Sequence, residues 1–407
     1  MNRLVLIGNG FDLAHGLKTS YEDFIYWYWK QRILNLYQET TNISNDSLCK
    51  LSKLQNGSWS EFVFYNLNSL KNSDGKDIYG YLTRHSKDFE ITCTPFFNKI
   101  IKGIETKGWV DIENEYYRLL TEYALSNDSS SKIASLNKEL YYIQEKLIEY
   151  LSIINQGNAE TKECIKKKIY APIKAQDISV EASKTIQEYV KWWSERQRDA
   201  WERKLYEYGI SGSKSYNYIY DIEDFKKGTL QHTDYPELFM LPDCIMLLSF
   251  NYTKTAQEYL QKNKHNFMLN YIHGTIETPS SVIFGYGDEL DDKYKQIQNL
   301  NNNECLQNVK TIKYQEADNY RNVLAFVESA PFQVYIMGHS CGNSDRTLLN
   351  TLFEHKNCIS IKPFYYIKED GTDNYLELIQ NISRNFTDMK LMRDRVVNKM
   401  YCEPLVK

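Results

Sequence analysis

The feature that most constrains this chain is a set of short apolar runs, each about as long as one buried strand. The runs are Leu4–Ile7, Cys244–Phe250, Phe267–Ile272, Val282–Phe284, Val334–Met337 and Ile359–Ile367. Several precede segments whose apolar residues recur every three or four positions, namely Thr253–Lys262, Ser344–His355 and Tyr375–Phe386. A strand followed by a helix, repeated along the chain, is typical of a parallel sheet covered by helices. We therefore predict an α/β fold with a mostly parallel sheet.

Between about residue 20 and residue 240 the pattern changes to long segments rich in aromatic and charged residues. The clearest helical patterns there are Tyr21–Tyr37, Ile133–Ile154 and Val180–Tyr208. Such a region is equally consistent with a helical insertion and with a second domain. We predict that residues 1–20 and 240–370 form one core split in sequence. Residues 21–239 would then be a helical insertion, and residues 371–407 a C-terminal helical tail.

The composition is that of a soluble globular chain without a global attraction to nucleic acid or anionic lipid. The 407 residues include 49 Lys plus Arg and 53 Asp plus Glu, so the formal net charge is −4. No apolar run approaches the roughly 18 residues of a membrane span. The eight cysteines form no C-x-x-C pair, which argues against a zinc ribbon and a disulfide framework. We expect a reduced, cytoplasmic protein with no metal site.

A glycine-rich turn, Gly8–Asp12, follows the first apolar run and precedes a helix expected to begin near Leu13. Such a turn at the carboxyl end of a strand lets the backbone approach a phosphate. The G-x-G-x-x-G pattern is incomplete because Leu13 stands at its third glycine, so a tight structural turn is an equal alternative. Asp12 either binds a ligand hydroxyl or caps the helix.

Two further apolar runs end in polar residues, where α/β sheets place their ligands. Asn251 donates and accepts hydrogen bonds at any pH, so it either holds a ribose hydroxyl or a water, or caps a helix near Thr253. His273, followed by Gly274, can accept a proton near neutral pH. Lone histidines are more often structural, and its position at a strand end is what distinguishes His273 as a candidate general base.

The segment Gly338–Gly342 matches G-x-S-x-G, the nucleophile elbow of serine hydrolases, and lies between a predicted strand and a predicted helix. The only histidine after Ser340 is His355, on the helix that the elbow would start, so the partners of a catalytic triad are missing. A turn that holds a ribose or a phosphate through Gly338, Ser340 and Asp345 fits the same residues.

Other acidic residues carry weaker signals. Asp288 and Glu289 follow another glycine-containing strand end. They either face the same ligand cleft as the other strand-end residues or belong to a loop without a role in binding. Within the insertion, tryptophan followed by acidic residues usually marks the start of a packed helix, so we assign no chemistry there. These residues are Trp59, Glu61, Trp109, Asp111 and Glu113.

In order and spacing, four strand-end motifs resemble those of sirtuin-like NAD-binding domains: G-N-G-F-D, F-N-Y-T, H-G and G-H-S…D. The resemblance implies a Rossmann-like (sirtuin-like) sheet, NAD as substrate or ligand, and Asn251 and His273 as catalytic residues. The residues that it places around the nucleotide are Gly8, Asn9, Gly10, Phe11, Asp12, Ser249, Gly274, Gly338, His339, Ser340 and Asp345. Thr253 departs from the pattern, which usually has an acid there, and the four-cysteine zinc module of protein deacylases is absent.

More specifically, the opening Leu4–Tyr21 and the blocks at 109–113, 250–253 and 338–345 look like those of bacteriophage abortive-infection AbiH proteins, over most of the chain. This resemblance implies a role in phage defence but names no reaction. We favour an NAD glycohydrolase that breaks the nicotinamide–ribose bond and is held inactive by homo-oligomerisation or a partner protein. A nucleotide sensor without catalysis and a serine hydrolase using Ser340 are the alternatives. Neither a membrane nor a nucleic-acid partner is indicated.

Overall fold

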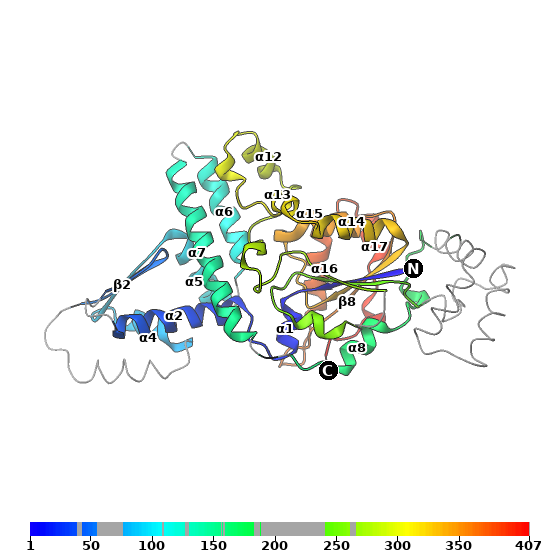
Figure 1. Cartoon of the computed structure of the whole chain (residues 1–407), viewed down its shortest axis with the longest axis horizontal. Helices are drawn as coiled ribbons and strands as arrows, with labels where there is room; N and C mark the ends of the chain where they lie inside the picture. Colours follow the sequence, from blue (N-terminus) through cyan, green and yellow to red (C-terminus); the bar gives the residue numbers. More distant parts are fainter. Residues whose placement is uncertain are drawn as a thin grey trace. The chain divides into compact units, whose positions relative to one another are not determined.

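The computed structural model describes residues 1–38, 43–54, 76–107, 110–126, 130–155, 157, 159–182, 188, 241–260 and 266–406. The chain forms two compact units (Figure 1). The first unit comprises residues 1–17, 157–283 and 311–407, and the second comprises residues 18–156 and 284–310. The C-terminal segment therefore groups with the N-terminal strand, while residues 284–310 group with the region that follows residue 17.

A five-stranded parallel sheet organises the first unit, which confirms the predicted α/β class. Its strands are β1 (Asn2–Ile7), β5 (Ile245–Ser249), β6 (Phe267–Tyr271), β7 (Phe332–Met337) and β8 (Cys358–Phe364). Their order in the sheet is β6-β5-β1-β7-β8, with parallel pairing throughout. Counted along the chain, this is the order third, second, first, fourth, fifth, which is the beginning of the Rossmann order. Figure 1 shows the blue N-terminal strand among green and orange segments from the second half of the chain.

Apolar side chains on both faces of the sheet explain why its strands are continuous apolar runs. Leu4 and Leu6 belong to one buried cluster, and Val5 and Ile7 belong to the other. The helices that contribute to the first cluster are α14 (Asn319–Ser329), α15 (Arg346–Phe353), α16 (Tyr375–Arg384) and α17 (Met389–Arg395). Those that contribute to the second are α1 (Asn9–Ala14) and α8 (Glu163–Tyr170).

Two local predictions for this unit are wrong. Val282–Phe284 is not a strand, because the N–H of Ile283 donates to the carbonyl of His273 and its carbonyl accepts from the Tyr252 hydroxyl. The backbone groups of Ile283 thus bond to a turn and to a side chain rather than to a neighbouring strand. Of the helix expected over Thr253–Lys262, the structure contains only a 3₁₀ helix, η3 (Thr255–Tyr259), after which Leu260 adopts an extended conformation.

The second unit combines helices with a small antiparallel sheet that the sequence did not predict. The sheet has the order β2-β3-β4, with β2 (Ile43–Asn45), β3 (Cys49–Lys53) and β4 (Phe89–Cys93). The helices are α2 (Tyr21–Gln38), α4 (Lys76–Arg84), α5 (Pro95–Lys107), α6 (Ile112–Ala124), α7 (Ser130–Ile154) and α12 (Asp292–Gln298). The predicted helices Tyr21–Tyr37 and Ile133–Ile154 are confirmed, whereas most of Val180–Tyr208 lies outside the described residues. In the part of the chain that the structure describes, no helix has the length and apolarity needed to cross a membrane.

Two turns meet backbone to backbone at the centre of the first unit. The turn after β7 brings the carbonyl of Gly338 to 2.8 Å from the nitrogen of Gly10. Gly338 has a φ of +73°, and a Cβ there would lie 2.1 Å from the nitrogen of Phe11. A Cβ on Gly8 would lie 2.5 Å from the Cα of His339. Glycine is therefore required on both sides of this contact.

We expect Gly338→Ala to lower the free energy of unfolding by more than about 3 kcal/mol, because it adds a backbone clash to an unfavourable φ. The measurement is the midpoint of urea unfolding. Gly371→Ala is the matched control, because Gly371 also has a positive φ, of +81°, but apart from its chain neighbours no heavy atom of the described residues lies within 4 Å of an added Cβ. The control should lose only about 1 kcal/mol. Equal losses in the two variants would show that the close contact contributes nothing.

Candidate functional site

Polar residues from several loops gather at the carboxyl edge of the parallel sheet. Ile7 pairs with Ser249 and Met337, and Ser249 pairs with Tyr271, so four strands end at one level. Within two residues of these ends stand Gly8, Asn251, His273 and His339. The predicted strand-end residues therefore lie in adjacent loops, where parallel sheets bind their ligands.

Asn251 connects the loop after β5 to the loop after β1. Its Nδ2 donates to the carbonyl of Gly8 at 3.0 Å, and its side chain is buried. Ser249 closes the turn between them, because its hydroxyl accepts from the Asn251 N–H and donates to the Asn251 carbonyl, both at 3.2 Å. Asn251 therefore does not cap the following helix, whose N-cap is Lys254.

Asp12 lies inside α1 rather than at its cap, which is Gly8. Its Oδ2 accepts from the Thr253 hydroxyl at 2.6 Å, and only 1% of the residue is exposed. Its Oδ1 makes no hydrogen bond to any other described residue. Burial raises the pKa of Asp12, against the smaller lowering effect of the Thr253 hydroxyl. A buried carboxylate oxygen without a donor is a candidate contact for a ligand hydroxyl.

His273 is the centre of a buried titratable cluster. Its Nε2 lies 3.2 Å from Oδ1 of Asp345 and 3.2 Å from the Tyr314 hydroxyl, and the residue exposes only 4%. Phe250 packs edge-on against its ring, with centroids 5.3 Å apart. The next residue, Gly274, has a φ of +76° and turns the chain away. An imidazole so placed, beside a carboxylate and shielded from bulk water, has the setting of a general base.

His339 approaches the same carboxylate from the loop after β7. Its Nε2 is 3.6 Å from Oδ2 of Asp345, and its ring centroid is 4.1 Å from that of Phe250. Its Nδ1 accepts from the backbone N–H of Cys341 at 3.0 Å. This contact assigns the ring proton to Nε2, on the side of Asp345.

The backbone N–H groups of the first turn are directed at the protein itself. Gly8 donates to the carbonyl of Met337 at 3.3 Å, Gly10 donates to Gly338, and Phe11 donates to Gly8 at 2.9 Å. In this conformation these three groups are not offered to a phosphate. Asn9 is the exposed residue of the turn.

Ser340 lies at the tip of the second turn and is exposed. Its carbonyl accepts from Nδ2 of Asn381 at 2.9 Å, and Cys341, with a φ of +55°, is held by Asn385 Nδ2 through its own carbonyl. Within the described residues, no hydrogen bond joins the Ser340 hydroxyl to a histidine or an acid. The turn thus lacks the contacts of a Ser-His-acid triad.

The remaining sequence candidates lie elsewhere. Asp288 belongs to the second unit, where its carboxylate accepts from the N–H of Leu290 and the hydroxyl of Tyr286. Asp111 caps α6, as expected for a helix start. Glu113 accepts from Nζ of Lys310 at 2.9 Å in a buried ion pair of that unit. Trp59, Glu61 and Trp109 lie outside the described residues.

Sequence reasoning missed two aromatic members of the site. Tyr314 stacks on His273 with an interplanar angle of 9° and is itself stacked on Tyr320. No motif marks Tyr314, because it is 41 residues from His273 and follows no strand. Phe250 was part of the F-N-Y-T motif, but only the structure shows that its ring packs against both imidazoles. Asp345, predicted as a ribose contact, proves to be the shared partner of both histidines.

Comparison with known proteins gives one family. A family model described as bacteriophage abortive infection AbiH matches residues 4–366. Neither the comparison with curated proteins nor that with solved structures yields a match. The match includes Asp12, Asn251, His273, His339 and Asp345.

The titration of Asp12 predicts a pH-dependent stability. Because its folded-state pKa is raised above 3.8, the folded protein retains a proton that the unfolded chain has already lost. Wild-type stability therefore falls as pH rises from about 4 to the raised pKa, whereas Asp12→Asn lacks this loss. We expect the free energy of unfolding of the variant, relative to wild type, to increase over that range, as measured by urea unfolding.

Asp370→Asn is the control for this measurement, because hydrogen bonds from Thr372 lower the pKa of the exposed Asp370. A lowered pKa contributes stability that is lost as pH falls below about 4, so this variant should show no increase over the range measured for Asp12 and a small trend of the opposite sign below it. Parallel trends in the two variants would contradict the burial effect at Asp12.

Proposed function

The chain belongs to the bacteriophage abortive infection AbiH family, and on that premise we propose that it is an effector that hydrolyses NAD at the nicotinamide–ribose bond. The family implies a role in abortive infection. The reaction is our inference, and the observation that carries it is the His273–Asp345 pair at the carboxyl edge of a sheet with Rossmann strand order.

The strand order supports a nucleotide as the ligand. In open α/β sheets the ligand lies outside the carboxyl ends, where successive connections leave the first strand in opposite directions. Here that point is between β1 and β7, because β5 and β6 lie on one side of β1 and β7 and β8 on the other. The segments that follow β1 and β7 carry Asp12, within α1, and His339, and the loops after β5 and β6 carry Asn251 and His273.

The proposed reaction needs one general base and a site that is shielded from bulk water. Cleavage of the bond to the nicotinamide nitrogen returns the electron pair to the ring, which leaves neutral, and the ribose passes through an oxocarbenium-like state. A water attacks the ribosyl carbon and gives its proton to His273. The products are nicotinamide, ADP-ribose and one proton. Asp345, 3.2 Å away, stabilises the imidazolium that forms.

We assign the polar residues around His273 to different parts of the substrate. Asn251, anchored through Nδ2 to the Gly8 carbonyl, presents its amide oxygen to the ribose or to the attacking water. Oδ1 of Asp12 is the acceptor proposed for a ribose hydroxyl, because it makes no hydrogen bond to the other described residues. The exposed Ser340 and Asn9 are the polar groups proposed to meet the distal ribose and the pyrophosphate.

A nucleotide sensor without turnover is the second candidate, and one observation favours it. Asn251 and His339 both hydrogen-bond to loop backbone, at Gly8 and Cys341. A ligand that draws on either side chain therefore competes with a contact that fixes a loop. Such competition would convert binding into a change of loop structure.

We expect the purified protein to release nicotinamide from NAD, and His273→Ala to reduce the rate at least about 10²-fold while changing the NAD Kd little. Asn251→Ala should reduce the rate by a similar factor, and Asp345→Asn about tenfold or more. Chromatography measures release, and calorimetry measures binding. His355→Ala is the matched histidine control and should retain wild-type turnover, because His355 pairs with Glu328 away from this edge.

A cellular measurement separates an inactive preparation from a wrong assignment. Cells carrying the wild-type chain should lose NAD during an infection that the chain aborts, whereas cells carrying His273→Ala should keep their NAD and allow phage growth. Abortive infection with unchanged NAD would refute NAD hydrolysis. NAD binding without release, by a chain active in cells, would identify the sensor.

A further inference from the structure

Two cysteines stand directly opposite each other in the small sheet of the second unit. Cys49 begins β3, Cys93 ends β4, and the antiparallel register pairs them. The pair next to the cysteines carries a ladder hydrogen bond from the Thr94 nitrogen to the Leu48 carbonyl, and the pair at the other end of the two strands carries one from the Leu54 nitrogen to the Asp88 carbonyl. Hydrogen-bonded pairs alternate along such a ladder, so Cys49 and Cys93 form a non-hydrogen-bonded pair.

The backbone of Cys49 confirms this assignment. Its N–H donates to the Asp46 carboxylate at 2.9 Å, and its carbonyl accepts from the Asp46 N–H and from Nη2 of Arg32. Both groups thus face away from β4. Opposite residues in non-hydrogen-bonded pairs have Cα atoms about 4.5 Å apart. That separation lies inside the range of about 4.4–6.8 Å that a disulfide spans.

The two thiols also interact, and they are not equivalent. The interaction between the two side chains lowers the pKa of Cys93 and raises that of Cys49, which burial raises further. Cys49 is buried, whereas Cys93 is partly exposed. Cys93 is therefore the thiol with more access to reagents, and the direction of its pKa shift favours its thiolate.

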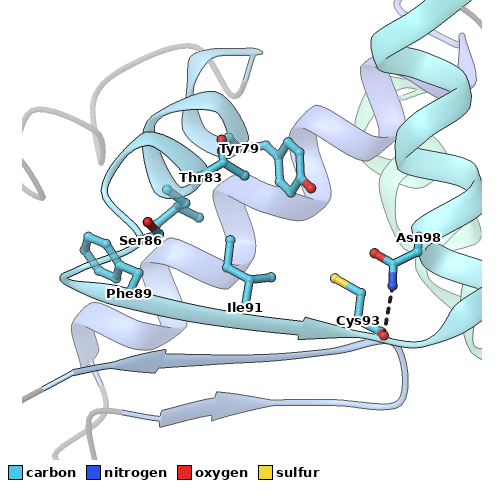
Figure 2. Close-up of a pocket in the computed structure, with 8 residues that line it drawn as sticks. Tyr79, Thr83, Ser86, Phe89, Ile91, Cys93 and Asn98 are labelled. Carbon is cyan, nitrogen blue, oxygen red and sulfur yellow. Dashed lines mark hydrogen bonds between the residues drawn. The ribbon is translucent and has the colours of Figure 1, made fainter.

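Cys93 opens onto a pocket of about 230 Å³. Figure 2 shows its sulfur on the same side of β4 as Ile91, with Tyr79 and Thr83 from α4 across the pocket. Asn98 holds the end of the strand, because its Nδ2 donates to the Cys93 carbonyl at 3.1 Å. A small oxidant that enters this pocket reaches Cys93 first.

We propose that Cys49 and Cys93 are a peroxide-oxidised dithiol that closes into a cross-strand disulfide, with Cys93 as the attacking thiol and Cys49 as the resolving thiol. The Cys93 thiolate attacks one peroxide oxygen, and the O–O bond breaks to give a sulfenic acid and hydroxide. The Cys49 thiol then attacks the Cys93 sulfur, and its proton leaves with the displaced hydroxide as water. In sum, two thiols and one hydrogen peroxide give one disulfide and two waters.

This site is independent of the reaction proposed for the sheet unit. The disulfide would join β3 to β4 across the intervening chain and constrain the unfolded state of the second unit. Oxidation would thus stabilise this unit without changing any residue at the carboxyl edge of the parallel sheet.

The experiment treats the full chain with hydrogen peroxide, blocks free thiols, and identifies linked peptides by mass spectrometry without reduction. The expected product is one Cys49–Cys93 peptide pair that dithiothreitol removes, formed at least about tenfold faster than any oxidation of the exposed Cys164. In Cys49→Ser, Cys93 should accumulate as a sulfenic acid that dimedone captures. In Cys93→Ser, Cys49 should remain reduced.

Three results would overturn the proposal. One is linkage of either cysteine to a different partner in the intact protein. Another is oxidation of Cys93 no faster than that of Cys164. The third is dimedone capture at Cys49 rather than at Cys93 in the single variants. Cys164→Ser serves as the control variant and should form the Cys49–Cys93 link at the wild-type rate.

Discussion

The backbone contact between the turns after β1 and β7 is the constraint on which the site depends. Gly10 donates to the Gly338 carbonyl, and a Cβ on Gly8, Gly10 or Gly338 would lie within 3 Å of the opposite turn. Because the turns touch, the Gly8 carbonyl is held where Asn251 reaches it, and His339 is held where Phe250 packs on it. The close contact between the two turns therefore explains these glycines without any ligand.

This packing determines which hydrogen-bond donors of the glycine-rich turn are available to a ligand. A phosphate site of the dinucleotide-binding type uses free backbone N–H groups at a helix start. Here the N–H groups of Gly8, Gly10 and Phe11 already donate to carbonyls. In the function that we propose, recognition at this edge therefore relies on side chains. Oδ1 of the buried Asp12 has no hydrogen bond among the described residues, so it would gain one from a ligand donor.

The sequence predicted the sheet well because strands buried on both faces need continuous apolar runs, and five of the six runs are strands. Val282–Phe284 has the same apolarity, but its backbone bonds to the His273 loop and to Tyr252, which no local pattern reveals. Their positions at the ends of predicted strands likewise allowed us to predict that Asn251 and His273 lie at the same edge of the sheet. Tyr314 could not be predicted, because its place beside His273 depends on tertiary packing across 41 residues. The pairing of Cys49 with Cys93 could not be predicted either, because it depends on the register of a small sheet in a region that the sequence pattern indicated to be helical.

The position of Asp345 between two imidazoles divides their roles. One carboxylate can compensate one added charge, and both rings approach it, at 3.2 Å from His273 and 3.6 Å from His339. A second proton on His339 would have to enter at Nδ1, where it would displace the N–H of the buried Cys341. Leaving that N–H without an acceptor costs about 1–3 kcal/mol. Nε2 of His273 lies 3.2 Å from Oδ1 of Asp345 and 3.2 Å from the Tyr314 hydroxyl. We therefore propose His273, rather than His339, for the proton transfer of the proposed reaction, while His339 holds the turn and lies beside the Asp345 carboxylate.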